Sequence, residues 1–483
     1  MSVRVLAAGV CLGLLAGCAA VGPDYAGPPA STAETVGGFP SSAAADQRVV
    51  ADEPPATWWR EMKDARLDAL IDAALGANYD LRIALANVEA ARAALDIQST
   101  RRRPTVDANA TVEEARNPSA LVQQLDPDTE LPSATRGSFS LDLSWEVDLF
   151  GRVRRSIEAA SAELGSLEAV RNGVITSVLG RVARAYIDLR GAQTRLDVAE
   201  RNVEVRRQTL DLVMLLNAEG AATELDVARA RTQLLTSQAT VPSLQADATT
   251  ALNRLSALTA RPPGAWSAEL AGRAPLPEVP SFVALGAPAD LLRRRPDIQA
   301  AERALAAATA RIGVATADLF PSVSFGARLG VAAQPLSSLD AAGAPFFALG
   351  PTVSWNLFDR EATYALIRQQ DAAAAAGMAR YEAAVTNALE EVDSAVNAWL
   401  NERDRRTQLQ AARDASHAAW QLAQVRYKEG VEDFLTVLEA QRSLLLIDDQ
   451  LAQSQIDFAQ KLIDIYLALG GGWETVAPPA TAK

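Results

Sequence analysis

Four segments of the chain alternate between apolar and polar residues with a period of two. In the clearest, Ser138 to Leu149, the odd-numbered residues are apolar and the even-numbered residues are polar. The other three segments run from Thr105 to Glu113, from Ser322 to Val331 and from Phe347 to Leu357. A period of two predicts β-strands with one apolar and one polar face. Strands of about ten residues with aromatic residues near their ends suit a membrane barrel, although a soluble sheet with one buried face would show the same alternation.

Long stretches of helical periodicity follow each pair of predicted strands. Residues 154–218 contain no proline, and about 65 residues at about 1.5 Å each predict a helix near 100 Å long. Residues 362–428 predict a second helix of similar length, and a returning helix of roughly 35 residues follows each of the two. A short amphipathic helix is predicted after Trp58-Trp59, and further short helices are predicted at 79–100 and 297–317. A soluble coiled-coil rod would have such helices, but it would not account for the alternating strands.

The two halves of the chain repeat one another. The stretch from Gly220 to Leu235 recurs 210 positions later, from Gly430 to Leu445. The strand-to-helix junction Asp148-Leu-Phe-Gly-Arg152 recurs as Asn356-Leu-Phe-Asp-Arg360. We therefore predict an α+β fold, built from a duplicated unit of long helical hairpins and four transmembrane strands per chain.

The N-terminal residues have the pattern of an export signal. Arg4 precedes an apolar core, and Leu15-Ala-Gly-Cys18 resembles the lipobox of bacterial lipoproteins, in which Cys18 becomes the first mature residue. Cys18 would then carry a diacylglycerol and an N-linked acyl chain, and Ala19 after it favours the outer membrane. The alternative is a plain secretory signal with a chance cysteine. We expect no other cofactor.

The predicted domains follow from these patterns. They are a signal peptide (1–17), a lipid-anchored tether (18–60), a first repeat (61–262), a proline-rich linker (263–288), a second repeat (289–470) and a tail (471–483). No segment after the signal is apolar enough for a transmembrane helix, so a membrane-spanning part would consist of strands. The net charge of -13 argues against nucleic acid as a partner.

Oligomerisation follows from the number of strands. Four strands cannot close a barrel, because eight is about the smallest number observed. Open strand edges in hydrocarbon would leave backbone groups unpaired, at a cost of several kcal/mol each. Several copies must therefore contribute strands to one barrel, and eight, twelve or more strands satisfy this requirement.

Several motifs resemble one known family. They are Leu15-Ala-Gly-Cys18, Trp58-Trp59, Trp145-Glu-Val-Asp-Leu-Phe-Gly151, Ala287-Pro-Ala-Asp-Leu-Leu-Arg-Arg-Arg-Pro-Asp-Ile298 and Tyr427-Lys-Glu-Gly430. They resemble the outer-membrane lipoprotein channels of tripartite efflux systems, in the OprM/NodT-like branch of the TolC superfamily. The resemblance implies a homotrimer with a twelve-stranded barrel and a periplasmic helical cylinder. It also implies two partners, a periplasmic adaptor protein and an inner-membrane pump of the resistance-nodulation-division type.

The same resemblance implies a gate where the helical hairpins turn. Glu439 lies where relatives have a pore-facing Asp, Leu435 lies at an apolar constriction, and Arg442 follows on the same face. Residues expected to flank the gate are Tyr427, Glu432, Asp226, Arg229 and Arg231. The alternative is an exposed ion pair between Glu439 and Arg442 along one helix.

We predict a passive duct that conducts small molecules, not an enzyme. His417, the only histidine, lies in a helical stretch, and we find no metal or phosphate motif. Two alternatives stay open: the exit duct of a type I protein secretion system, and a lipid-anchored periplasmic coiled-coil scaffold.

Overall fold

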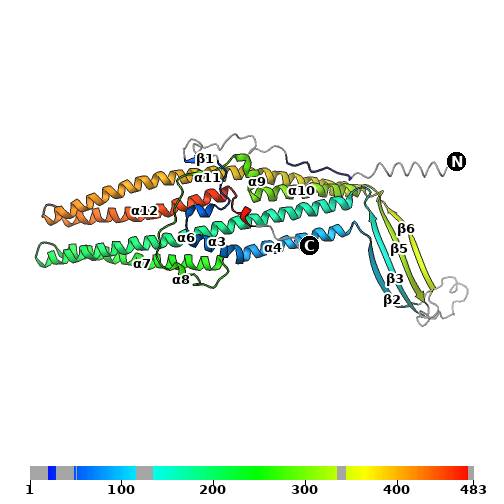
Figure 1. Cartoon of the computed structure of the whole chain (residues 1–483), viewed down its shortest axis with the longest axis horizontal. Coiled ribbons are helices and arrows are strands. Elements are labelled where there is room, and N and C mark those ends of the chain that lie inside the picture. The colour runs from blue at the N-terminus through cyan, green and yellow to red at the C-terminus, as the bar shows by residue number, and fades with distance from the viewer. Residues whose placement is uncertain (1–19, 29–47, 51, 116–133, 334–343, 477–483) are drawn as a thin grey trace. The chain divides into compact units, whose positions relative to one another are not determined.

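The computed structural model describes residues 20–28, 48–50, 52–115, 134–333 and 344–476 (Figure 1). The predicted signal, Cys18, most of each predicted loop between paired strands and the end of the tail lie outside the described residues. The chain forms two compact units, and each draws on both halves of the sequence. The first unit comprises residues 1–28, 88–166 and 301–380, and the second comprises 29–87, 167–300 and 381–483.

The first unit contains a four-stranded antiparallel sheet in the order β2-β3-β5-β6. Its strands are β2 (Thr105–Ala115), β3 (Ala134–Val147), β5 (Ser322–Ala333) and β6 (Ala344–Ser354). All four predicted strands are therefore present. Strands β2 and β6 form the two edges of this sheet, and neither has a second neighbour among the described strands.

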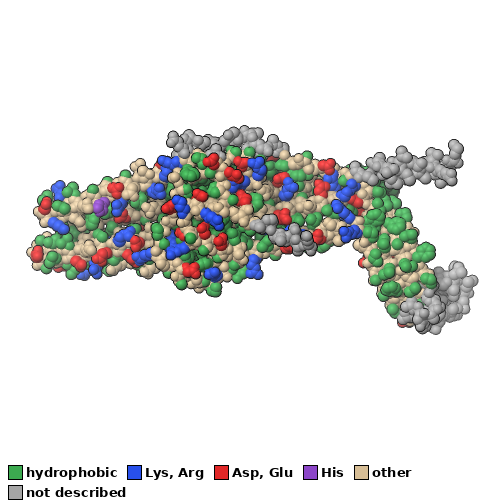
Figure 2. All heavy atoms as spheres, in the orientation of Figure 1, with side chains coloured by type: hydrophobic (Ala, Val, Ile, Leu, Met, Phe, Trp, Pro, Cys, Tyr) green, Lys and Arg blue, Asp and Glu red, His purple; other side chains and the backbone are tan. Residues whose placement is uncertain are grey.

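The register of the sheet places apolar residues on one face and polar residues on the other. Leu141 lies between Ala108 and Leu329, and Leu329 lies opposite Phe347. Phe347 is 82% exposed, and most other large apolar side chains of this face are also exposed. Hydrophobic side chains cover the strands in Figure 2. An exposed apolar face of this extent on a strand sheet is typical of a surface that contacts lipid or another chain.

Two strands end earlier than the alternation suggests. The predicted segments reach Leu149 and Leu357, whereas β3 ends at Val147 and β6 at Ser354. After β3 the Leu149 amide donates to the Val147 carbonyl, and the Asp148 carboxylate accepts from the Val153 and Arg154 amides at the start of the next helix. These local bonds end the ladder, although the apolar-polar alternation continues past it.

The predicted helices are present with bounds close to those expected. The hairpin of the first half consists of α6 (Arg152–Ala218) and α7 (Glu224–Leu258), and that of the second half consists of α11 (Arg360–Lys428) and α12 (Phe434–Ala468). The shorter helices α4 (Tyr79–Thr100) and α10 (Pro296–Ala317) precede the strand pairs. Among the described helices, none has a stretch long and apolar enough to cross a membrane.

A short N-terminal segment is fixed to the first unit. The Val21 amide donates to the Phe150 carbonyl, and Arg155, whose side chain is buried, donates to the carbonyls of Val21 and Gly22. Arg155 also forms an ion pair with Asp24 at 2.6 Å. Residues 20–24 are therefore held at the start of α6.

The second unit has an aromatic core. The short 3-10 helix η2 (Trp58–Met62) precedes α3 (Ala65–Ala77), which buries Leu67, Leu70, Ile71 and Ala74. Trp58 is buried and stacks on Tyr466 of α12, with 5.3 Å between ring centroids. Trp399 stacks in the same way on Phe458, at 5.2 Å, and joins α11 to α12.

Short elements around an arginine motif lie in the proline-rich linker and directly after it. These are α8 (Ser267–Leu270), β4 (Val283–Ala284), which pairs in parallel with β1 (Val49–Val50), η3 (Pro288–Asp290) and α9 (Leu291–Arg294), while η5 (Trp473–Thr475) follows α12. Arg295 is buried and donates to Glu391 and to the Ala468 carbonyl, both at 2.7 Å. Arg294 lies 3.3 Å from Glu53 and from Glu474. The motif therefore ties the linker to α11, to the end of α12 and to the N-terminal segment.

Candidate functional site

Each helical hairpin turns at a glycine in a left-handed conformation. Gly220 has φ of 77° and Gly430 has φ of 73°. In the second turn the Val431 amide donates to the Arg426 carbonyl and the Gly430 amide to the Tyr427 carbonyl, and the first turn has the same two bonds. This is the Schellman pattern, which a residue without a Cβ atom favours. The glycines at the predicted hairpin turns therefore satisfy the last carbonyls of α6 and α11.

The two returning helices, α7 and α12, begin with the same kind of N-terminal cap. Threonine and aspartate exchange positions between the two caps. Thr223 caps α7 and accepts from the Asp226 amide, while the Asp226 carboxylate accepts from the Thr223 amide and hydroxyl. Asp433 caps α12 and accepts from the Thr436 amide and hydroxyl, each at 2.9 Å. These bonds from Thr436, with a smaller contribution from the charge of Arg229, hold the pKa of Asp433 below its usual value.

The ends of the two hairpins share one apolar core. Buried residues from all four long helices form it: Leu210, Val213, Val227, Ala230, Leu234, Ala423, Phe434, Val437 and Leu438. Tyr427 packs against this core, 5.5 Å from the ring centroid of Phe434. Gln441 is buried beside it and donates to the Thr209 hydroxyl at 3.0 Å. Within one chain the two tips therefore pack as a single body.

The three predicted gate residues lie on the exposed face of α12. Leu435 is 42% exposed, and Glu439 and Arg442 are exposed one and two turns further along. Within the part of the chain that the structure describes, Glu439 and Arg442 form no ion pair with each other or with another residue. The intrahelical pair considered as the alternative is therefore not formed. Gln441 and the buried leucines occupy the opposite face, so this stripe is free to face a pore or a partner.

The predicted flanking residues do not form one cluster. Asp226 and Arg229 lie 3.8 Å apart on α7, and Glu432 pairs with Arg426 at 3.0 Å. Burial raises the pKa of Tyr427, and the nearby Asp226 charge raises it further, so this charge reaches from the first tip to the second. Arg231 is exposed, and no described carboxylate pairs with it.

Asp433 and Arg426 were missed by the sequence analysis, although both belong to the second turn. Asp433 faces the charge of Arg229, and Arg426 holds Glu432. The spacing Asp433-x-x-Thr436 matches Thr223-x-x-Asp226 with the two residues exchanged. A comparison of the two turns for capping residues could therefore have found Asp433.

A second polar surface lies on the strands. On the polar face, Asp142 of β3 forms an ion pair with Arg328 of β5. Asp142 also accepts from Asn109 of β2 at 2.8 Å and from Ser140 at 2.9 Å. This network crosses three strands, so the polar face has satisfied hydrogen bonds while the opposite face has apolar side chains.

Comparison with known proteins decides the family. Residues 70–261 and 287–471 match the family described as outer membrane efflux protein. The chain belongs to this family. The solvent efflux pump outer membrane protein SrpC of Pseudomonas putida is 33% identical over 463 residues, which cover 95% of this chain and 96% of SrpC. Nodulation protein T of Rhizobium leguminosarum bv. trifolii is 30% identical over 472 residues, which cover 96% of both chains. The solved outer-membrane channel OprN superposes with a TM-score of 0.86 at 37% identity, over 94% of this chain and 99% of OprN.

Family membership confirms the main sequence predictions. The chain is an outer-membrane efflux protein of the TolC type, and the α+β fold with helical hairpins and a strand domain is confirmed. The efflux family is a family of ducts and not of enzymes.

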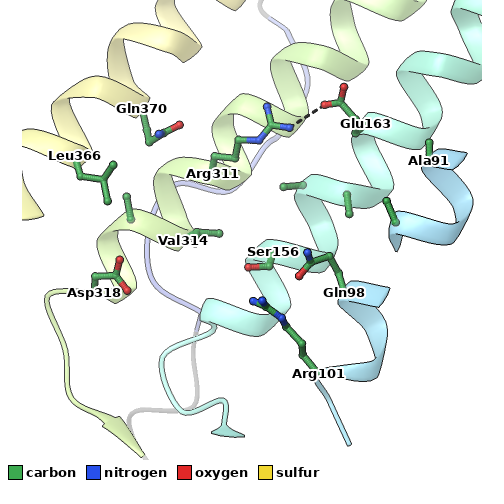
Figure 3. Close-up of a pocket in the computed structure, with 14 residues that line it drawn as sticks. Ala91, Gln98, Arg101, Ser156, Glu163, Arg311, Val314, Asp318, Leu366 and Gln370 are labelled. Atoms are coloured by element: carbon green, nitrogen blue, oxygen red, sulfur yellow. Dashed lines mark hydrogen bonds and ion pairs between the residues drawn. The ribbon is translucent and has the colours of Figure 1, made fainter. Parts of the chain in front are cut away.

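A cavity of about 440 Å³ lies among four helices of the first unit of this efflux protein (Figure 3). Small residues of α4, α6 and α10 line much of it, and Arg311 and Glu163 form an ion pair across it at 2.9 Å. Burial raises the pKa of Asp318 at one end, while the charge of Arg152 opposes this shift. The cavity therefore combines an apolar wall with one neutralised ion pair.

No described group of histidine, cysteine, aspartate and glutamate side chains in the efflux protein has the arrangement of a metal site. His417 lies beside Trp420, with ring centroids 6.0 Å apart, in a groove that α6, α11 and α12 line. Its closest ring neighbour is thus an aromatic side chain.

Proposed function

We propose that three copies of this chain form one outer-membrane duct with a twelve-stranded barrel and a helical cylinder below it. The observation that carries the proposal is the four-stranded sheet, with its exposed apolar face, its polar face and two edges open among the described strands. Closure with other copies would pair both edges and remove the cost of unpaired backbone groups in lipid. Twelve strands are the number that the resemblance to tripartite efflux channels implies.

The duct conducts passively and opens at the hairpin tips. In a trimer, the stripe of Leu435, Glu439 and Arg442 would be present three times around the axis. Three carboxylates at one level attract cations and repel one another, and an apolar ring beside them restricts flow. The exposed, unpaired state of Glu439 and Arg442 supports this assignment.

The duct works with two further proteins. A periplasmic adaptor protein contacts the duct, and an inner-membrane pump of the resistance-nodulation-division type supplies the energy for a duct that conducts passively. Cys18 carries the lipid that anchors each chain to the outer membrane. Small toxic molecules are the proposed cargo, since the relatives include a solvent efflux component and toluene efflux components. Their efflux function favours efflux over the secretion alternative for this chain.

The mass of the purified complex in detergent tests the proposal most directly. We expect three chains by light scattering or native mass spectrometry. A stable monomer would leave both sheet edges unpaired and would favour the scaffold alternative. A dimer or tetramer would keep the duct but change the number of strands to eight or sixteen.

The gate assignment has its own test in planar lipid bilayers. The double variant Leu435→Ala, Glu439→Ala removes the apolar ring and the carboxylates, so we expect a severalfold higher conductance than that of the wild type. Ser443→Ala, at a neighbouring exposed position of α12, is the matched control and should leave conductance unchanged. Equal conductance of the double variant and the control would contradict the gate assignment.

A further inference from the structure

The two strand pairs of the first unit repeat one another in register and in hydrogen bonds. Thr105 lies opposite Ser144, and Ser322 lies opposite Ser354. In both pairs the hydroxyl of the first residue donates to the carbonyl of the second at 3.2 Å. The two strand pairs are therefore equivalent. A residue of β2 corresponds to the residue 217 positions later in β5, and a residue of β3 corresponds to the residue 210 positions later in β6.

The same offsets hold at the ends of the strands. The indole nitrogen of Trp145 donates to the Arg102 carbonyl at 3.2 Å. Its counterpart Trp355 donates to the Leu319 carbonyl at 3.1 Å, and Leu319 follows Arg102 by 217 positions. Beyond Trp355 the second copy is two residues shorter than the first, so the junction residue Phe150 corresponds to Phe358.

The boundary between the two repeats shows how neighbouring copies of this unit meet. Phe150 at the end of the first strand pair stacks on Phe320 at the start of the second, with 4.7 Å between centroids. The counterpart of Phe150 is Phe358, which is 99% exposed in the single chain. The counterpart of Phe320 is Arg103. If the repeats continue around a ring, Phe358 of one protomer lies beside Arg103 of the next.

The boundary within the chain is neutralised by carboxylates. Arg152 donates to Glu146 at 2.9 Å and 2.6 Å. Asp148 holds Arg154 at 3.2 Å, and the charge of Asp318 also acts on Arg152. Every arginine of this boundary therefore has a carboxylate within reach.

The described residues that would form the equivalent boundary between chains lack this neutralisation. Arg360 corresponds to Arg152, but the two-residue deletion removes the counterpart of Glu146, and the guanidinium of Arg360 lies over the Trp355 ring at 5.8 Å. Arg102 and Arg103 are exposed, and none of these three arginines has an ion-pair partner in the described ranges. Asp359 and Glu361 flank Arg360 in sequence without pairing with it.

We propose that the phosphate of an anionic phospholipid binds at each boundary between protomers, held by Arg360 of one protomer and by Arg102 and Arg103 of the next. Trp355 directly follows the last residue of β6, and Arg360 is the first residue of α11, so the site lies where the sheet ends and the helices begin. Basic side chains gather at this level in Figure 2. Guanidinium groups bind phosphate oxygens through paired hydrogen bonds, and the adjacent apolar face accommodates the acyl chains.

The proposal rests on the trimer of the proposed function. Native mass spectrometry measures the number of chains and the number of bound lipids in one experiment. The delipidated complex is titrated with dioleoylphosphatidylglycerol, and its mass gives the number of chains and of bound lipids. We expect up to three lipids on three chains. The triple variant Arg102→Gln, Arg103→Gln, Arg360→Gln should bind at least tenfold more weakly, since each arginine near an anionic lipid contributes about fivefold. Arg380→Gln, about 30 Å further along α11, should bind as the wild type does.

Other outcomes would overturn the proposal. A wild-type complex that is a monomer would overturn the proposed duct itself, whereas an oligomer that binds this lipid as tightly with the triple substitution would overturn the lipid site alone. Equal affinity for dioleoylphosphatidylcholine or for inorganic phosphate would also contradict an anionic-lipid site. If the triple variant does not assemble, Arg360→Gln alone serves, with an expected loss of about fivefold.

The geometry of the boundary has a separate test by disulfide formation. The pair Phe358→Cys and Arg103→Cys should link chains into dimers and trimers on a denaturing gel under mild oxidation. The matched pair Phe150→Cys and Phe320→Cys should close within one chain and leave a monomer band. Absence of links between chains, with the internal control closed, would remove Arg103 from the site.

Discussion

At the residue scale, one carboxylate makes the second hairpin turn sensitive to acid. The bonds from Thr436 hold the pKa of Asp433 below its usual value in the folded chain. A lowered carboxyl pKa contributes stability that is fully present above the unfolded pKa of about 4 and is lost as pH falls through the folded pKa. We expect Asp433→Asn to lower the melting temperature at about pH 6 and to have almost no effect at roughly pH 2.

The measurement is differential scanning fluorimetry of the detergent-solubilised protein across this range. Ser443→Ala, a nearby exposed residue without a titrating group, should give a difference from the wild type that does not vary with pH. A destabilisation by Asp433→Asn that is the same at both pH values would show that the Thr436 bonds do not depend on the charge.

Some single residues could be predicted from a physical pattern in the sequence, and others only from family resemblance or not at all. The hairpin glycines were predictable because only a left-handed turn of this kind requires a residue without a Cβ atom. Leu435, Glu439 and Arg442 were predicted from family resemblance, since the spacing of Glu439 and Arg442 alone favours an ordinary ion pair along the helix. The charge of Arg229 acts on Asp433 because one tip packs on the other, and no pattern within one helix predicts that influence.

At the scale of elements, α6 and α12 approach closely where α6 has glycine. An added Cβ atom at Gly191 would lie 2.6 Å from Ile456, and one at Gly180 would lie 2.5 Å from Leu467. Gly191→Val should therefore lower the free energy of unfolding by about 1–3 kcal/mol through overpacking, as measured by denaturant or thermal unfolding. The second change Ile456→Ala should restore part of the loss, because it frees the space that the valine fills.

A matched glycine shows whether the effect comes from this contact. Gly76 of α3 has open space around the position of a Cβ atom, so Gly76→Ala should be neutral or slightly stabilising. Equal destabilisation by Gly191→Val with and without Ile456→Ala would mean that α6 and α12 do not meet at these residues.

The elements themselves were largely predictable, because period and length separate long helices from strands. The strand ends were not: Trp355 and Leu357 continue the alternation after β6 has ended at Ser354. Capping side chains such as Asp148, which follows β3, end the hydrogen-bond ladder of the sheet, and a pattern of alternating residues does not reveal such caps. Arg294 and Arg295 follow the linker, and the sequence showed them only as part of a motif, whereas their partners come from distant parts of the chain.

At the scale of the whole molecule, two devices would hold the protein in the membrane: the strands and the lipid on Cys18. We expect Cys18→Ala to stay in the membrane fraction after a high-salt wash and to need detergent for release, because the apolar strand face alone buries enough surface. A Cys18→Ala protein that is released without detergent would show that the lipid is the main attachment. The matched Cys11→Ala change, inside the predicted signal, should have no effect on the mature protein.

The bonds that fix Val21, Gly22 and Asp24 to Phe150 and Arg155 bear on how the duct sits in the membrane. Only two residues separate Cys18, the proposed site of acylation, from Val21, so an acylated Cys18 would lie within about 10 Å of the folded body once these bonds have formed. A lipid attached there would hold the start of α6 close to the membrane surface. We therefore expect the docking of this short segment to set the depth at which the duct enters the bilayer.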